Sequence, residues 1–287
     1  MKYLTLLILC LSVQAESQFH FSKAAKHSDV KIKVKGYTTH LYYYQNQSNH
    51  LIITAHGYLD NCSYMNYLHR PLWKNGHSLL CIDLPGHGQS TGARADINSF
   101  DTYGKILKEI PRDILNHYDK ISFIAHSTGA VLLHEYLRTA GDIDFYKIVL
   151  LAPLVRSKLW HLSVAGNYLL GSFIETLERK NLKNKKFKKF TSQDKFLITH
   201  MRTHWFGELK AWNDRLEQKP KKHYQDMTVY FPSEDEVIDL DYNLSFYKKY
   251  FPNAQIKMLP AATHRIQFDS DALVDNFVQE ITQSFNE

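Results

Sequence analysis

Short apolar runs alternate with longer segments of helical periodicity along most of the chain. The first segment along the chain, "VKIKVKGYTTHLYYYQ" (30–45), predicts two paired strands. The apolar runs that follow are "HLIITAHG", "HSLLCIDLPG", "KISFIAHS", "FYKIVLLAP", "MTVYFPSEDE" and "NAQIKMLPAATH". Helices are predicted before Asn75, over 99–118 and 128–141, and from about 271 to 285. Strands that alternate with helices in this way predict an α/β fold with a mostly parallel sheet covered on both faces.

The alternation stops between about Pro153 and Asp226, where helix-like aromatic and basic sequence such as "FIETLERKNLKNKKFKKF" takes its place. Because the strands return afterwards, the pattern indicates one α/β domain with a helical insertion rather than two tandem domains. The predicted organisation is a core in two parts, 16–152 and 227–287, and a helical basic insertion over 153–226. At 44% hydrophobic residues in 287, the chain has enough apolar side chains for a large core.

The N-terminus has the pattern of a secretory signal peptide. Lys2 precedes an apolar run from Leu4 to Val13, and Val13-Gln14-Ala15 fits a signal-peptidase site, which predicts cleavage of residues 1–15. The run is shorter than the roughly 20 residues that span a bilayer, although a retained anchor is the alternative. Export to a periplasm or the exterior is expected. Cys62 and Cys81 would then remain in an oxidising compartment, either as a disulfide or as two buried thiols.

Positive charge is concentrated in the insertion. Residues 153–226 contain 16 Lys and Arg against 7 Asp and Glu, or +9, whereas the rest of the mature chain has 18 against 22, or −4. The basic residues follow no nucleic-acid recognition motif, which argues against a nucleic-acid partner. A basic, aromatic surface facing anionic phospholipid or an acidic substrate is the functional interpretation, and a solvated helix face is the alternative. The sequence leaves the oligomeric state open.

The candidate nucleophile is Ser127, in "AHSTGA" (125–130). It lies where a predicted buried strand ends and a helix begins, between small residues that allow a sharp turn. This context is typical of a nucleophile elbow, which lifts the hydroxyl out at the carboxyl edge of the sheet. The helix N-terminus behind it favours developing negative charge.

A serine hydroxyl needs a base and an orienting acid, which in this arrangement follow it in the order Ser, acid, His. Asp235 stands just past one later strand and His264 just past the last one. The neighbouring carboxylates are alternatives to Asp235: Glu234, Glu236, Asp239 and Asp241. His126 adjoins Ser127 in sequence, but its side chain is expected to point elsewhere.

An oxyanion hole needs two donors beside the nucleophile. The N–H of Thr128 is one candidate. The N–H of Tyr58 is the other, because His56-Gly57 ends a strand and lets the next residue approach the site; a plain glycine turn is the alternative.

These motifs carry a resemblance to the α/β-hydrolase fold over about residues 30–285. Within it the chain is similar to serine hydrolases of the monoacylglycerol lipase and lysophospholipase type, often grouped as serine-aminopeptidase-like. The matching segments are "AHGY", "DLPGHGQS", "AHSTGA", "SEDEVI" and "THRI". In that group the "DLPGHGQS" loop is structural, so His87 receives no catalytic or metal role. Ala125 replaces the usual Gly of the elbow, and the insertion corresponds to the cap that lines the substrate pocket.

The resemblance implies an exported serine hydrolase of carboxylic esters, with lysophospholipid or monoacylglycerol as favoured substrates and an acyl-enzyme on Ser127. The alternatives are an exported peptidase or acyltransferase on the same fold, and a binding protein that has lost the chemistry. The sequence has no zinc-binding spacing and no Walker-type phosphate loop, so no cofactor and no metal are expected.

Overall fold

The structure is a computed structural model that describes residues 25, 27–158, 160, 175–179 and 184–286. The predicted signal peptide, residues 1–15, lies outside these described residues. Among the helices in the described ranges, none is both long enough and apolar enough to cross a membrane.

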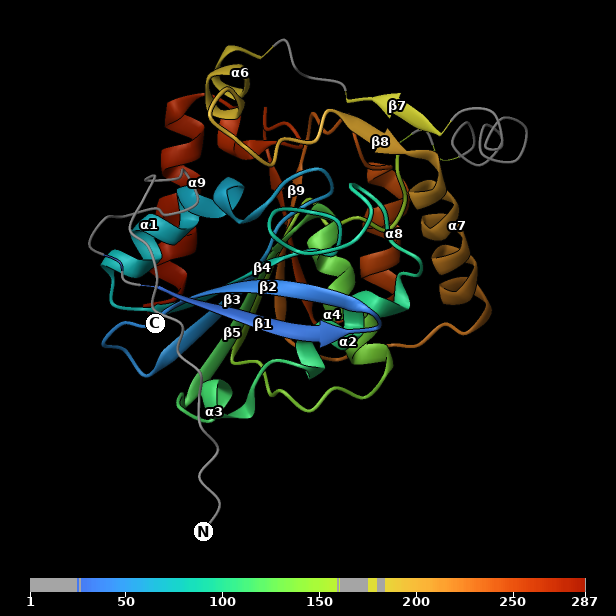
Figure 1. The fold of residues 1–287 in the computed structure, drawn as a ribbon. Helices are drawn as coiled ribbons and strands as arrows, with labels where there is room; N and C mark the ends of the chain where they lie inside the picture. Colours follow the sequence, from blue (N-terminus) through green and yellow to red (C-terminus); the bar gives the residue numbers. More distant parts are fainter. Residues whose placement is uncertain (1–24, 26, 159, 161–174, 180–183, 287) are drawn as a thin grey trace.

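One mixed sheet forms the centre of the molecule (Figure 1). Within the described residues it has eight strands in the order β1-β2-β4-β3-β5-β6-β9-β10. Their bounds are β1 Ser28–Val34, β2 Tyr37–Tyr44, β3 His50–Ala55, β4 Ser78–Asp83, β5 Lys120–His126, β6 Lys147–Leu151, β9 Met227–Pro232 and β10 Ala254–Leu259. β1 pairs antiparallel with β2, and β2 antiparallel with β4. The remaining pairs are parallel, as predicted.

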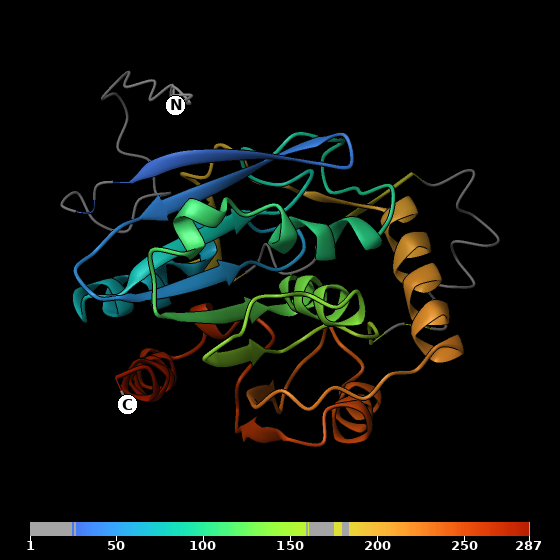
Figure 2. The same cartoon turned by 90° about the horizontal axis from the view of Figure 1, so that it is seen from below.

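Helices cover both faces of the sheet, and Figure 2 shows them from below. One face packs against α2 (Asp101–Lys108), α4 (Ala130–Arg138) and α8 (Leu240–Tyr250), and the other against α1 (Asn66–Lys74) and α9 (Asp271–Ser284). On β5, Phe123 and Ala125 point into the first layer and Ile124 into the second. Because successive side chains of a strand face opposite ways, apolar runs without alternation fit strands that are buried on both faces. The short helix α3 (Arg112–Leu115) leads into β5.

The insertion between β6 and β9 is only partly helical. Its described part contains β7 (Thr176–Glu178), α6 (Lys185–Thr191), β8 (His200–Arg202) and α7 (Thr203–Gln218). β7 and β8 form a small antiparallel sheet, which the sequence pattern did not predict because three-residue strands carry no periodicity. α7 packs through Trp205, Leu209 and Trp212 against the α2 and α4 layer. In Figure 1, α6, β7 and β8 lie along the top of the molecule, above the central sheet.

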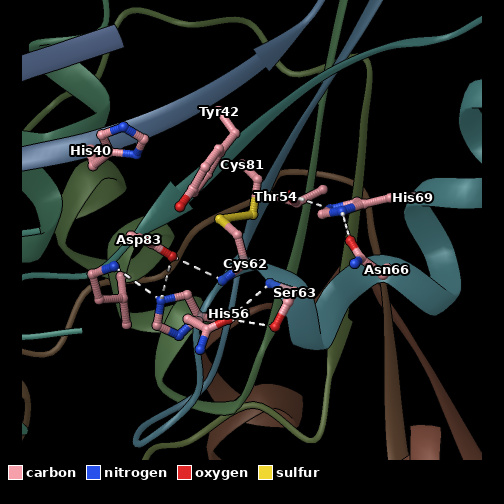
Figure 3. The surroundings of a disulfide bond; sticks show 12 residues. His40, Tyr42, Thr54, His56, Cys62, Ser63, Asn66, His69, Cys81 and Asp83 are labelled. Carbon is pink, nitrogen blue, oxygen red and sulfur yellow. Dashed lines mark hydrogen bonds and ion pairs between the residues drawn. A yellow bond between two sulfur atoms is a disulfide. The ribbon is translucent and has the colours of Figure 1, made fainter. Parts of the chain in front are cut away.

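Cys62 and Cys81 form a disulfide with their Cα atoms 5.9 Å apart, so of the two possibilities open in the sequence the structure has the bonded one. The bridge joins the short helix η1 (Cys62–Met65), which follows the loop after β3, to the adjacent strand β4. Figure 3 shows the bridge beside Asp83, whose carboxylate accepts hydrogen bonds from the backbone N–H of Cys62 at 2.9 Å and of Gln89 at 2.8 Å. The "DLPGHGQS" segment and the loop after β3 are therefore fastened to each other.

Candidate active site

Ser127 occupies a tight turn between β5 and α4. Its φ angle is +51°, in the left-handed region that non-glycine residues seldom adopt. Such conformations persist only where the surrounding structure enforces them. Here a Cβ on Gly129 would lie 2.5 Å from the carbonyl oxygen of Ala55, so the turn is pressed against the end of β3. The backbone therefore has the geometry that the sequence predicted for this elbow.

Ser127, His264 and Asp235 form one hydrogen-bonded chain. His264 Nε2 lies 3.0 Å from Ser127 Oγ, and His264 Nδ1 lies 2.8 Å from Asp235 Oδ2. Asp235 follows β9 and His264 follows β10, so the three side chains come from the carboxyl ends of three parallel strands. All three are buried. The structure thus brings together the three residues that the sequence singled out.

The second carboxylate oxygen of Asp235 is also bound. Its Oδ1 accepts hydrogen bonds from the backbone N–H groups of Val237 at 2.8 Å and Ile238 at 3.0 Å. Burial acts to raise the pKa of Asp235, but the His264 charge and these hydrogen bonds outweigh it and lower the pKa below its usual value. An ionised carboxylate only accepts, so the proton of neutral His264 is on Nδ1 and its Nε2 is free to accept the Ser127 proton.

The carboxylates that were alternatives to Asp235 lie elsewhere in the loop and in α8. Asp239 is the N-cap of α8, where its side chain accepts a hydrogen bond from the N–H of Tyr242 at 3.1 Å. Glu234 and Glu236 are exposed. Within the described structure, the carboxylate hydrogen-bonded to His264 is that of Asp235.

His126 is a neighbour of the site to which the sequence assigned no role. Its Nε2–H donates to the carbonyl oxygen of His264 at 2.9 Å rather than binding the Ser127 hydroxyl. Burial, followed by the nearby His264, lowers the pKa of His126 to about 4, so the ring is neutral at pH 7. This bond ties the loop of the candidate base to the strand of the candidate nucleophile. Its partner is a backbone oxygen far along the chain, which no local motif specifies.

The loop after β3 runs directly against the nucleophile. A Cβ on Gly57 would lie 2.9 Å from His126 Nδ1 and 3.1 Å from Ser127 Cβ, so only glycine fits without displacement. The turn is shaped by His56, whose Nδ1–H donates to the Gly57 carbonyl at 2.8 Å while Nε2 accepts from the N–H of Leu84 at 3.0 Å. The loop backbone therefore passes the Ser127 side chain at Gly57, and Tyr58 is the next residue of that loop.

The Tyr58 side chain faces the insertion. Its ring stacks on Trp205 of α7 with centroids 3.8 Å apart. Its hydroxyl donates to the carbonyl oxygen of Ala95 at 2.8 Å and accepts from the N–H of Arg202 at 3.0 Å. Tyr58 is therefore fixed between the core and the insertion. Thr128, the other residue predicted for an oxyanion hole, is buried at the start of the helical turn after Ser127.

His87 is a structural residue of its loop. Its Nδ1–H donates to the Pro85 carbonyl at 2.8 Å, and burial lowers its pKa to about 3. In the part of the chain that the structure describes, no three His, Cys, Asp or Glu side chains are grouped as metal ligands.

Comparison with known proteins decides the family. The sequence model of the family described as "Serine aminopeptidase, S33" matches residues 46–271. The chain belongs to this family. It is thus a hydrolase of the α/β-hydrolase type, as its motifs implied. A "Probable serine hydrolase" of Drosophila melanogaster is 34% identical over 87 residues, which are 30% of this chain and 25% of that protein.

The fold of this family member is shared with solved lipases and esterases. A soluble variant of the Saccharomyces cerevisiae monoglyceride lipase, in complex with a substrate analogue, has a TM-score of 0.74 at 13% identity; 94% of this chain and 97% of that chain are covered. The monoacylglycerol lipase of Paleococcus ferrophilus has a TM-score of 0.71 at 17% identity, over 85% and 97% of the two chains. Est1E of Butyrivibrio proteoclasticus, with ferulic acid bound, has a TM-score of 0.62 at 15% identity, over 89% of this chain and 97% of that chain.

Proposed function

We propose that the protein is an exported serine hydrolase that cleaves carboxylic esters, with lipid-like esters such as lysophospholipid or monoacylglycerol favoured. The observation that carries this proposal is the hydrogen-bonded chain from Ser127 through His264 to Asp235. Membership of the serine aminopeptidase family and the fold shared with monoglyceride lipases support it.

In the proposed reaction Ser127 Oγ attacks the ester carbonyl while His264 Nε2 takes the hydroxyl proton. Asp235, ionised and fixed by two backbone N–H groups, holds the imidazole and stabilises its cation. The N–H groups of Tyr58 and Thr128 hold the tetrahedral oxyanion. His264 then gives its proton to the leaving alcohol, which departs from the acyl-enzyme. A water molecule deprotonated by His264 attacks the acyl carbonyl, and His264 returns its proton to Ser127 Oγ as the ester bond to the serine breaks and the acid departs.

The direct test is Ser127→Ala, which is expected to lower kcat by several orders of magnitude, since the residues of such a triad act as a unit. Ser122→Ala is the matched control, because it removes another buried hydroxyl, on the strand β5 that leads to Ser127, and this hydroxyl is hydrogen-bonded to His50 instead. It should keep its turnover. Near-normal turnover by Ser127→Ala protein would contradict the proposal.

Peptidase and acyltransferase activity are the competing proposals, and a substrate panel distinguishes them from hydrolysis of esters. Lysophospholipid, monoacylglycerol, a short-chain p-nitrophenyl ester and an aminoacyl anilide are compared by kcat/KM. Preference for the anilide would favour a peptidase, and transfer of the acyl group to an added alcohol would favour a transferase. A binding protein without chemistry would be folded and yet unlabelled by a fluorophosphonate probe.

Export is part of this proposal and is supported by the Cys62 to Cys81 bridge, since disulfides persist mainly in oxidising compartments. The expected mature N-terminus is Glu16. Mass spectrometry of the exported protein tests it, and a chain that keeps residues 1–15 would instead indicate a retained anchor.

Contact of the insertion with an anionic membrane surface is a separate proposal. Lys185, Lys186, Lys188 and Lys189 are all exposed on α6, while Phe187 is buried beneath them, and Lys186 pairs with Asp271. Binding to phosphatidylserine vesicles should fall in a Lys188→Ala/Lys189→Ala variant and at high salt. Lys221→Ala/Lys222→Ala removes two exposed lysines from elsewhere in the insertion as the control. Binding that ignores both changes would contradict this contact.

A further inference from the structure

Three segments that are far apart in the sequence meet at the carboxylate of Asp60. Asp60 lies in the loop that carries Tyr58, Arg179 follows β7 in the insertion, and Arg265 is the residue after His264. Asp60 Oδ1 lies 2.5 Å from Arg179 Nη2 and 3.1 Å from Arg265 Nη1. One carboxylate therefore joins the predicted oxyanion loop, the insertion and the loop of the candidate base.

This cluster lies inside the protein. The side chains of Arg179, Asp60 and Arg265 are 1%, 2% and 14% exposed. Burial alone would raise the pKa of Asp60, but Arg265 and Arg179 outweigh it and lower the pKa to about 2. Asp60 is thus ionised across the physiological range. Both guanidinium groups also lie over the Phe187 ring, at 4.8 Å for Arg179 and 4.9 Å for Arg265.

Arg179 also binds the backbone of the loop. Its Nη1 donates to the carbonyl oxygen of Leu59 at 2.7 Å and to that of Ile198 at 3.2 Å. Leu59 follows Tyr58 directly and has a φ angle of +67°, an unusual conformation that needs support from its surroundings. Since Tyr58 itself stacks on Trp205 and binds the N–H of Arg202, the insertion holds two successive residues of this loop.

We propose that Arg179 is a positioning residue that sets the oxyanion loop and the His264 loop in their reactive arrangement, so that the site is complete only when the insertion is seated. This inference rests on the proposed function. An oxyanion donor stabilises the transition state only when it lies within a few tenths of an ångström of its productive position. A buried arginine that binds one carboxylate and two carbonyl oxygens fixes the relative positions of these groups to that precision.

The test compares Arg179→Gln with Asp60→Asn, their double variant and a control. Arg215→Gln is the matched control, because Arg215 also joins the insertion to the core, at 3.0 Å from Asp101 of α2, but away from the oxyanion loop. Arg179→Lys is the conservative variant, since it keeps the charge beside Asp60 but a single ammonium cannot reproduce the planar fork. Kinetics are measured on a short-chain ester, with folding checked by urea unfolding.

Arg179→Gln and Asp60→Asn are each expected to lower kcat by about 10- to 100-fold with KM changed less than about threefold, because the loop acts on the transition state. The double variant should be little worse than the poorer single one, since both changes break the same cluster. Arg179→Lys should recover part of kcat, and Arg215→Gln should keep it. Equal kcat in Arg179→Gln and Arg215→Gln, a change in KM alone, or multiplicative losses in the double variant would overturn the inference.

Measurements on the wild-type protein distinguish a wrong function from a wrong positioning role. If the wild-type protein hydrolyses none of the panel and is not labelled by a fluorophosphonate, the proposed function is wrong. Hydrogen exchange of the amides of residues 57–62 then decides the positioning role. Faster exchange in Arg179→Gln than in Arg215→Gln supports it, and equal exchange in the two variants overturns it.

Discussion

Replacing Asp235 with Asn should fix His264 in the wrong tautomer. Asp235 Oδ1 accepts two backbone hydrogen bonds, from Val237 and Ile238, and Oδ2 accepts one from His264 Nδ1. An asparagine keeps the two backbone bonds only if its carbonyl oxygen takes the Oδ1 position. Its NH2 group then faces His264 Nδ1, which must present a lone pair. The ring proton therefore moves to Nε2, which faces Ser127. A protonated Nε2 has no lone pair and can no longer accept the hydroxyl proton.

The expected loss is about 10⁴-fold in kcat, by analogy with the same change of tautomer in a serine protease. That factor corresponds to about 5 kcal/mol in the activation free energy. The fold should be retained, because the two backbone bonds remain and Asn is close to Asp in size. The assays are steady-state kinetics on a short-chain ester and ¹⁵N NMR of His264, which reports whether Nδ1 or Nε2 carries the proton.

Asp239→Asn is the matched control in the same loop. Asp239 caps α8, and Asn is about as good an N-cap as Asp, so kcat should be unchanged. The reasoning is refuted if Asp235→Asn protein is folded and retains more than about a tenth of the wild-type kcat, or if its His264 still carries the proton on Nδ1.

Three further predictions address the backbone, the disulfide and buried histidine. Gly57→Ala should lower kcat by about 10- to 100-fold in protein that still folds, because the new methyl group would push on Ser127 Cβ at 3.1 Å; an unchanged kcat would contradict the close packing. Replacing Cys62 and Cys81 together with Ala should lower the free energy of unfolding in urea by about 3 kcal/mol, the loop-closure value for this 19-residue separation; equal urea midpoints for the variant and the oxidised wild type would refute it. Burial lowers the pKa of His134 from 6.5 to about 3, so the unfolded chain binds its proton first and stability should fall as pH drops from about 6.5 towards 3, by up to about 1.4 kcal/mol per pH unit. A series of urea midpoints from pH 7 to pH 4 should show a shallower slope for His134→Gln than for wild type.

Much of the architecture could be predicted from the sequence because its determinants are local. Each strand of the sheet is an apolar run that ends in a turn, and a parallel sheet brings the carboxyl ends of its strands to one edge. Ser127 stands directly after such a run, and Asp235 and His264 stand in the loops that follow two others, so their meeting follows from the order of elements. The order of elements could not show which carboxylate in residues 234–241 binds His264, because all of them follow the same strand.

The basic composition of the insertion was also evident from the sequence, but its arrangement was not. β7 and β8 are three residues each and pair only because the chain returns to the same place. In the sequence Arg179 looks like one more cation of a basic segment, yet in the fold it is buried against Asp60 and the Leu59 carbonyl.

The sequence by itself therefore determined the α/β core, the strand ends that carry Ser127, Asp235 and His264, and the glycine turn at Gly57. Only the tertiary structure decided which carboxylate binds His264, that Cys62 and Cys81 are bonded, and that His126 holds the His264 backbone. The physical reason is one of range. Strands, helices and turns depend on residues a few positions apart, whereas these contacts join side chains to partners 19 to 138 positions away, which only the packing of the whole chain brings together.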